Sequence, residues 1–133
     1  MRWCFLAAAL IALAAAALGC SSSGAAAVEG KVSYGGEPID VGTITFIPKS
    51  EGIKTGGIID NGAYNIEAKL GPPPGSHRVE IRWARPTGKT SKNEFGEEIK
   101  MRQEGLPEKY HDQSMLTAEI KPGKNVIDFA LEK

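Results

Sequence analysis

Apolar and polar residues alternate along most of the chain with a period of two, not with the 3.6-residue period of a helix. From Val28 onward the alternation predicts seven short strands, at residues 28–34, 43–46, 55–59, 64–68, 79–83, 116–120 and 127–131. Turn-forming residues separate the strands, and the clearest case is Asp60-Asn61-Gly62, where Asn and Gly tolerate positive φ. Such alternation buries one face of each strand and leaves the other wet, as in antiparallel sheets.

Seven such strands predict an all-β domain over residues 28–133, built as a seven-stranded antiparallel β-sandwich of two sheets around one core. The aromatic side chains of Tyr64, Trp83 and Phe129 are in register with apolar neighbours two residues away. We therefore expect all three in the core.

The N-terminal segment is set apart by an almost unbroken apolar run from Trp3 to Leu18, preceded by Arg2. The run is shorter than the roughly 20 residues of a membrane-spanning helix, and its length suits a signal-peptide core. It ends in Ala17-Leu18-Gly19-Cys20, which resembles the bacterial lipobox, although Leu is usual where Ala17 stands. The resemblance implies a signal peptide at 1–19 and a diacylglycerol on the thiol of Cys20.

Two alternatives remain for this segment: a secretory signal cut near Ala25 to Ala27, and an uncleaved anchor helix. The only cysteines are Cys4 and Cys20, so the domain is expected to fold without a disulfide. Residues 20–27 are expected to form a lipidated flexible tether. The absence of Asp directly after Cys20 favours the outer membrane over the inner one.

The charge of the whole chain is balanced, with 16 basic and 16 acidic residues. Nucleic-acid-binding domains leave a basic footprint, so no nucleic-acid partner is expected. The balance also argues against electrostatic docking on a membrane. The acyl chains on Cys20 would then be the membrane contact, since two or three chains hold stably.

Residues 85–114 interrupt the strand pattern with a long segment rich in charge of both signs. A short helix is expected at 97–104, and the Leu106 to Tyr110 part is expected to pack back on the sandwich. Long loops on rigid scaffolds often carry function. The alternative is a solvated excursion that binds nothing.

No catalytic, cofactor or metal site is predicted. The two histidines, His77 and His111, lack metal-ligand spacing, and His111-Asp112 is expected to be exposed. Ser76 and Ser114 do not belong to a nucleophile-elbow motif. Asp60 is explained as a turn residue. We therefore expect a protein that is not an enzyme.

The order of several landmarks is similar to that of carboxypeptidase regulatory-like domains. These landmarks are Gly30-Lys31-Val32, Gly36-Glu37-Pro38, Thr43 to Phe46, Thr55, Asp60 to Tyr64, Gly75, Val79 and Ile81. The resemblance implies a transthyretin-like sandwich. Such a scaffold does not by itself determine function.

Together these patterns predict a lipid-anchored, non-catalytic module of the bacterial cell envelope, expected to be a monomer that binds an envelope protein or a glycan. Two alternatives stay open. The first is a structural spacer without a specific ligand, and the second is a hydrolase acting through residues 85–114. A hydrolase would need a nucleophile or metal cluster, which the sequence does not display.

Overall fold

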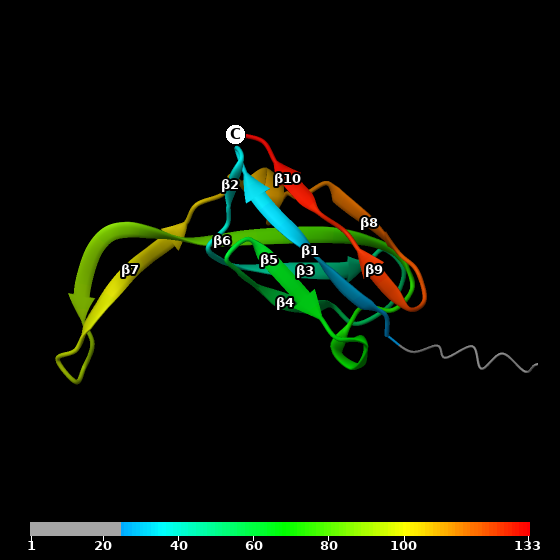
Figure 1. The fold of residues 1–133 in the computed structure, drawn as a ribbon, viewed down its shortest axis with the longest axis horizontal. Helices are drawn as coiled ribbons and strands as arrows, with labels where there is room; N and C mark the ends of the chain where they lie inside the picture. The colour runs from blue at the N-terminus through cyan, green and yellow to red at the C-terminus, as the bar shows by residue number, and fades with distance from the viewer. Residues whose placement is uncertain (1–24) are drawn as a thin grey trace, which may run out of the picture.

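A computed structural model of the chain describes residues 25–133, which form an all-β body with a two-stranded arm projecting from it (Figure 1). The strands are β1 (Ala27–Tyr34), β2 (Glu37–Pro38), β3 (Val41–Pro48), β4 (Thr55–Asp60), β5 (Ala63–Ile66), β6 (Gly75–Lys92), β7 (Glu98–Glu104), β8 (Leu116–Ile120), β9 (Lys124–Val126) and β10 (Phe129–Leu131). Two short 3-10 turns, η1 (Ala68–Leu70) and η2 (Glu108–Tyr110), complete the described secondary structure. The all-β prediction is confirmed.

Hydrogen bonds link the ten strands into one open sheet, whose main path runs β10-β1-β5-β4-β3-β6-β7. Strands β2 and β9 pair with β1, and β8 pairs with β6. The pairings of β1 with β9 and with β10 are parallel, whereas every other pairing recorded for the described strands is antiparallel. The structure therefore differs from the expected seven strands in number and in the direction of these two pairings.

The strand expected at 127–131 shows one cause of the difference. Strand β9 ends at Val126 and β10 begins at Phe129, although the Ile127 N–H between them still donates to the Glu29 carbonyl of β1. At the break, the Asp128 carboxylate accepts a hydrogen bond from the Lys31 backbone N–H at 2.8 Å. A side chain thus replaces the backbone partner at this point, which alternation alone does not reveal.

The sheet curves around a single apolar core to which β1, β3, β4, β5, β6, β8 and β10 all contribute. The predicted aromatic core members Tyr64, Trp83 and Phe129 are all buried, which confirms that prediction. Every buried apolar side chain of the described chain lies between Ala26 and Leu131.

The Tyr64 ring reaches its place because a glycine lies beside it. The Tyr64 hydroxyl donates to the Ile127 backbone carbonyl at 2.6 Å, and burial raises the pKa of Tyr64, which keeps the donor protonated. A Cβ on Gly30 would lie 1.8 Å from the Ile127 carbonyl oxygen. Gly30 thus permits a backbone approach that no other residue allows.

The β4–β5 turn lies where the sequence predicts it, and the body begins close to the predicted residue. The β4–β5 hairpin turns at Asn61 and Gly62, whose φ angles of 49° and 79° are positive, as the turn motif predicts. Ala26 is already buried and its N–H donates to the Pro72 carbonyl. The folded body thus begins slightly before the expected Val28.

Residues 85–114 are not the loop that the sequence suggested. Strand β6 continues to Lys92, with a shift of register against β7 between Pro86 and Thr90, and Glu98–Glu104 form strand β7, so the helix expected at 97–104 is wrong. The alternation of Ile99 and Met101 with charged residues was the available signal for a strand. The expected packing of the following segment is confirmed, since Leu106 and Tyr110 are both buried.

Candidate functional site

The arm, defined as residues 85–104, projects from the body and contributes no side chain to its core. It consists of the outer half of β6, a turn at 93–97 and strand β7, and none of its residues is buried. The turn is held by Asn93, whose Oδ1 accepts the backbone N–H groups of Phe95 at 3.0 Å and Glu97 at 2.9 Å. The turn carries Phe95 at the end of the arm, 80% exposed.

Both edges of the arm are open. Strand β3 pairs with β6 only as far as Gly42 and Trp83, and no described strand pairs with the outer half of β6 except β7. The far edge of β7 also has no partner among the described strands. An isolated two-stranded hairpin is at best marginally stable in water. Unpaired strand edges also invite pairing with another chain.

The two faces of the arm differ in character. Strand β7 places Ile99 and Met101, both exposed, on one face together with Gln103. Its other face carries only charged side chains, those of Glu98, Lys100, Arg102 and Glu104. On β6, Arg85 is paired with Gln103 and Ser91 with Ile99, so this face of the arm mixes two apolar side chains with polar ones, whereas the other face of β7 is charged.

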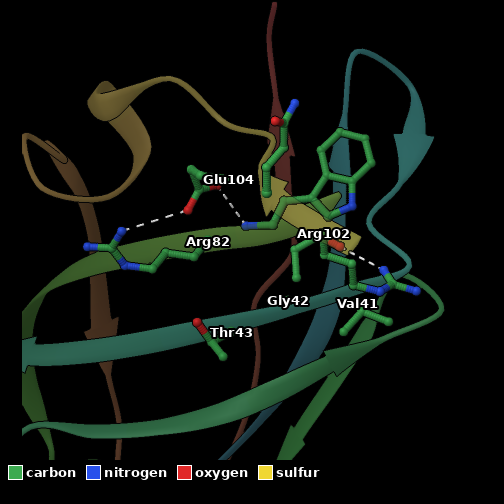
Figure 2. A pocket seen from close by; sticks show the side chains of 9 residues that line it. Val41, Gly42, Thr43, Arg82, Arg102 and Glu104 are labelled. Atoms are coloured by element: carbon green, nitrogen blue, oxygen red, sulfur yellow. Dashed lines mark hydrogen bonds and ion pairs between the residues drawn. The ribbon is translucent and has the colours of Figure 1, made fainter. Parts of the chain in front are cut away.

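A shallow groove of about 340 Å³ lies where the arm joins the body. Its lining residues are Val41, Gly42, Thr43, Arg82, Trp83, Ala84, Arg102, Gln103 and Glu104. Figure 2 shows Arg82 and Arg102 on opposite sides of the groove, with Glu104 held between Arg82 and the backbone of Trp83. The groove thus involves three neighbouring strands, β3, β6 and β7.

Glu104 joins the arm to the body. One oxygen of its carboxylate accepts the backbone N–H groups of Trp83 and Leu106, both at 3.0 Å. The other oxygen lies 3.7 Å from the guanidinium of Arg82, which also pairs with Asp112. Glu104 is the last residue of β7, so its carboxylate links β7 to β6 and to residues 105–114, here called the returning segment.

Asp40 forms a second connection on the other side of Trp83. Its carboxylate accepts the indole N–H of Trp83 at 2.7 Å and lies 3.2 Å from the guanidinium of Arg102. The indole hydrogen bond, helped by Arg102, lowers the pKa of Asp40. The guanidinium of Arg85 covers the Trp83 ring at 5.1 Å from the ring centroid, a cation–π distance. Charged groups thus contact Trp83 at two places, Asp40 at the indole N–H and Arg85 over the ring.

A Cβ on Gly105 would lie 2.8 Å from the Trp83 ring. The chain can turn from β7 back to the body only because this side chain is absent. Asp40, Glu104 and Gly105 are the functional positions that sequence reasoning missed. Their roles depend on contacts with Trp83 and Arg102, which no local pattern displays.

Charged side chains that line the groove link the arm to the body. The two guanidinium groups of the groove are engaged by carboxylates, and Thr43 supplies the one side-chain hydroxyl of the lining. Within the arm, the hydroxyl-bearing residues are Thr87, Thr90 and Ser91, whereas both histidines lie in the body. The hydrolase alternative concerns all of residues 85–114, and the histidine, aspartate and serine of that segment, His111, Asp112 and Ser114, lie beyond the arm.

Each histidine and serine considered in the sequence forms a hydrogen bond within the described chain. His77 is buried against Phe46, and its Nδ1 lies 3.0 Å from the Gly75 carbonyl. His111 is also buried, contrary to expectation, because its Nε2 lies 3.2 Å from the Leu106 carbonyl inside the returning segment. The hydroxyl of Ser114 donates to the Val79 carbonyl, and that of Ser76 donates to Glu119.

The two aspartates are separated by the fold. Asp60 lies in the β4–β5 turn, as expected, and Asp112 pairs with Arg82, which lowers the pKa of Asp112. Across residues 25–133, no three His, Cys, Asp or Glu side chains come together as a metal site would need. The predicted lipidation residue Cys20 lies outside the described residues.

Within residues 25–133, no helix has the length and apolarity needed to cross a membrane. Comparison of the chain with protein-family models, with curated proteins and with solved structures finds no match.

Proposed function

We propose that this chain is a lipid-anchored, non-catalytic module of the bacterial cell envelope that binds an envelope protein through its arm. The observation that carries the proposal is the arm itself, a hairpin that exposes two strand edges together with the apolar side chains of Phe95, Ile99 and Met101. Unpaired strand edges of this kind pair readily with another chain.

A protein partner suits the arm better than a glycan does. Open strand edges bind extended peptide by adding a strand, with backbone hydrogen bonds for affinity and side-chain contacts for specificity. The exposed apolar side chains of Phe95, Ile99 and Met101 supply such contacts. The clamp formed by Glu104 and Asp40 holds the arm in one orientation, and a preorganised element loses less entropy on binding.

We propose acylated Cys20 as the anchor, in the outer membrane rather than the inner one. The support is the apolar run that ends in Gly19-Cys20, together with the direction of the body. The described chain starts at one end of the body and the arm projects from the opposite end (Figure 1). An anchor before Ala25 would therefore present the arm away from the membrane.

For the body we propose the transthyretin-like class suggested by the carboxypeptidase regulatory-like landmarks. Two of these landmarks act as that class would require. Gly30 permits the close approach of Ile127, and Asn61-Gly62 close the β4–β5 hairpin. On this view, the arm is an elaboration of a common scaffold.

The test combines an anchor variant and an arm variant. In the arm variant, residues 87–101 are replaced by Asn-Gly, because Pro86 and Arg102 are paired across the hairpin and a two-residue turn can join them. We expect the variant to fold and to stay on the membrane while recovery of the envelope partner from its own membranes is lost. Unchanged recovery would overturn binding through the arm.

The anchor variant is Cys20→Ser. We expect metabolic labelling with a palmitate analogue to mark the wild-type chain and to spare the variant. Equal labelling of both chains would overturn the anchor while leaving the arm proposal intact, because the arm variant is assayed separately.

A further inference from the structure

The end of the body at which the described chain begins is formed by three loops, residues 47–54, 67–75 and 121–124, here called the basal end. The N–H of Ala26 donates to the Pro72 carbonyl and that of Ala27 to the Gly123 carbonyl, both at 2.8 Å. Two of the loops therefore lie directly beside the entering chain. The third is tied to the start of β6 by a hydrogen bond from Lys49 N–H to the Ser76 carbonyl.

The basal end is basic. Its three loops contain five exposed lysines, Lys49, Lys54, Lys69, Lys121 and Lys124, and two glutamates, Glu51 and Glu67. Lys69 pairs with Glu67, and Lys124 pairs with Glu29 on β1. The remaining three lysines form no ion pair within residues 25–133, so their charges face solvent. Glu119, at the end of β8, is the other nearby carboxylate and accepts a hydrogen bond from Ser76.

The opposite end of the body contains more carboxylates than lysines, although Arg102 and Arg82 pair with two of the carboxylates, Asp40 and Asp112. Its segments, residues 35–40, 60–62, 106–115 and 132–133, contain six carboxylates and two lysines. The acidic residues are Glu37, Asp40, Asp60, Glu108, Asp112 and Glu132. The near-zero net charge of the whole chain therefore conceals a separation of charge along the body, which the sequence-level balance could not reveal.

Two large aliphatic side chains lie among the basal lysines. Ile53 is 81% exposed and Leu70 is 66% exposed, each next to a lysine in sequence. Exposed aliphatic side chains flanked by lysines are the composition of surfaces that enter the boundary between headgroups and acyl chains of anionic membranes.

We propose that the basal end docks on an anionic lipid bilayer, with its lysines against the headgroups and with Ile53 and Leu70 in the interface. The proposal takes its orientation from the proposed anchor. Cys20 precedes Ala25 by five residues, a span of at most about 17 Å when fully extended. Because this tether is short, an acylated Cys20 lets the basal lysines approach within the Debye length of about 8 Å at physiological salt, where the headgroup charge is only partly screened.

The docking also gives the arm a direction. A single flexible attachment would leave the body free to lie on its side, whereas contact through the basal end holds the body upright. The arm would then extend away from the bilayer. The acidic charge of the far end supports the same orientation, because an anionic surface repels it.

The experiment uses residues 21–133, which lack Cys20, so lipidation cannot contribute, and circular dichroism first checks that this chain is folded. Flotation with vesicles of phosphatidylcholine alone is compared with flotation with vesicles containing about one third phosphatidylglycerol. We expect binding to the anionic vesicles only, weakened by added salt. Equal binding to both vesicles, or no binding to either, would overturn the docking proposal.

Two charge-reversal variants locate the surface. We expect Lys49→Glu with Lys54→Glu to weaken binding to the anionic vesicles at least tenfold. The matched control, Lys109→Glu with Lys133→Glu, makes the same change in net charge at the far end and should alter binding less than twofold. Equal losses in the two variants would show that net charge alone matters and would overturn the basal surface. Thermal unfolding of both variants checks that each is folded.

Failure here is distinguishable from failure of the proposed anchor. The flotation assay lacks Cys20, and the labelling assay of Cys20→Ser does not depend on the lysines. If the full chain is labelled at Cys20 but the chain without Cys20 does not float, the anchor is retained and the docking surface is lost. The reverse result would retain the docking surface and lose the anchor.

Discussion

The body and the arm of this molecule are made of the same secondary structure, yet different forces hold them. In the body, strands are covered on one face by a shared apolar core, so each strand is stabilised by residues distant in sequence. In the arm, two strands stabilise only each other. The contacts that hold them in place are gathered where the arm joins the body, around Asp40, Trp83 and Glu104, here called the root. The body's stability is thus a property of packing, and the arm's position is a property of a few hydrogen bonds.

The largest difference is expected from the same substitution made once in each region. Phe46 is fully buried in the body and Phe95 is exposed at the end of the arm. Phe46→Ala should lower the free energy of unfolding by about 3–5 kcal/mol, because it leaves a cavity in the core. Phe95→Ala should change it by less than about 0.5 kcal/mol.

Urea denaturation of both phenylalanine variants measures this contrast. Similar losses for Phe46→Ala and Phe95→Ala would mean that the arm packs on something that the body provides. The comparison between the two regions would then fail.

The root of the arm should give an intermediate effect. Glu104→Ala leaves the backbone N–H groups of Trp83 and Leu106 without their acceptor, a loss of about 1–3 kcal/mol for partly buried donors. Glu98→Ala, on the same face of β7 but farther out, serves as the control and should cost less than about 0.5 kcal/mol.

The same clamp limits how the arm can be removed. A deletion that stops before Arg102 keeps Glu104 and should unfold at nearly the wild-type temperature. One that extends through Glu104 should melt earlier. Equal melting of the two deletions would contradict the role assigned to Glu104.

Acid should act on the root before it acts on the core. The pKa values of Asp40 and Asp112 are lowered in the folded protein, by the Trp83 indole with Arg102 and by Arg82 respectively. A carboxyl group whose folded pKa lies below its unfolded value of about 3.9 stabilises the fold above that value. This contribution is lost as the pH falls through the folded pKa.

We therefore expect wild type to exceed Asp40→Asn in stability by a constant amount from pH 7 to about pH 5. The gap should close towards pH 2. Thermal unfolding of both chains across this range measures the gap. A gap that widens in acid would contradict the assignment of Asp40.

The smallest effect on stability is expected on the exposed face of the arm. Ile99→Thr with Met101→Thr keeps residues that favour strands and removes apolar surface that the body does not cover. The free energy of unfolding should change by less than about 0.5 kcal/mol, whereas recovery of the envelope partner should fall at least tenfold. A stability loss above 1 kcal/mol would show that this face is packed within the chain.

The same contrast explains which features the sequence could predict. Alternation and turn chemistry are local signals. They predict most of the body's strands, the turn at Asn61-Gly62 and the burial of the rings of Tyr64, Trp83 and Phe129. The arm was mistaken for a loop with a short helix, because abundant charge hid the period-two pattern around Ile99 and Met101. Charge is compatible with a strand whose two faces both meet solvent.

The root and the basal end could not be predicted for a different reason. Asp40 and Glu104 act on Trp83 from segments far apart in sequence, and their pairing exists only once β3, β6 and β7 are adjacent. The basal lysines come from three separate loops, so their clustering is invisible in a chain whose total charge is balanced. Long-range placement, and not residue type, carries the information in both cases.

The most direct test of the arm's role is site-specific photocrosslinking in the living cell, with benzoyl-phenylalanine placed at one exposed apolar position at a time. Phe95 lies at the end of the arm, and Ile58 is a control of similar exposure on the body. We predict that the probe at position 95 yields a discrete adduct with an envelope protein, and that the probe at position 58 does not. The same adduct from both positions, or none from position 95, would contradict an arm that binds a partner.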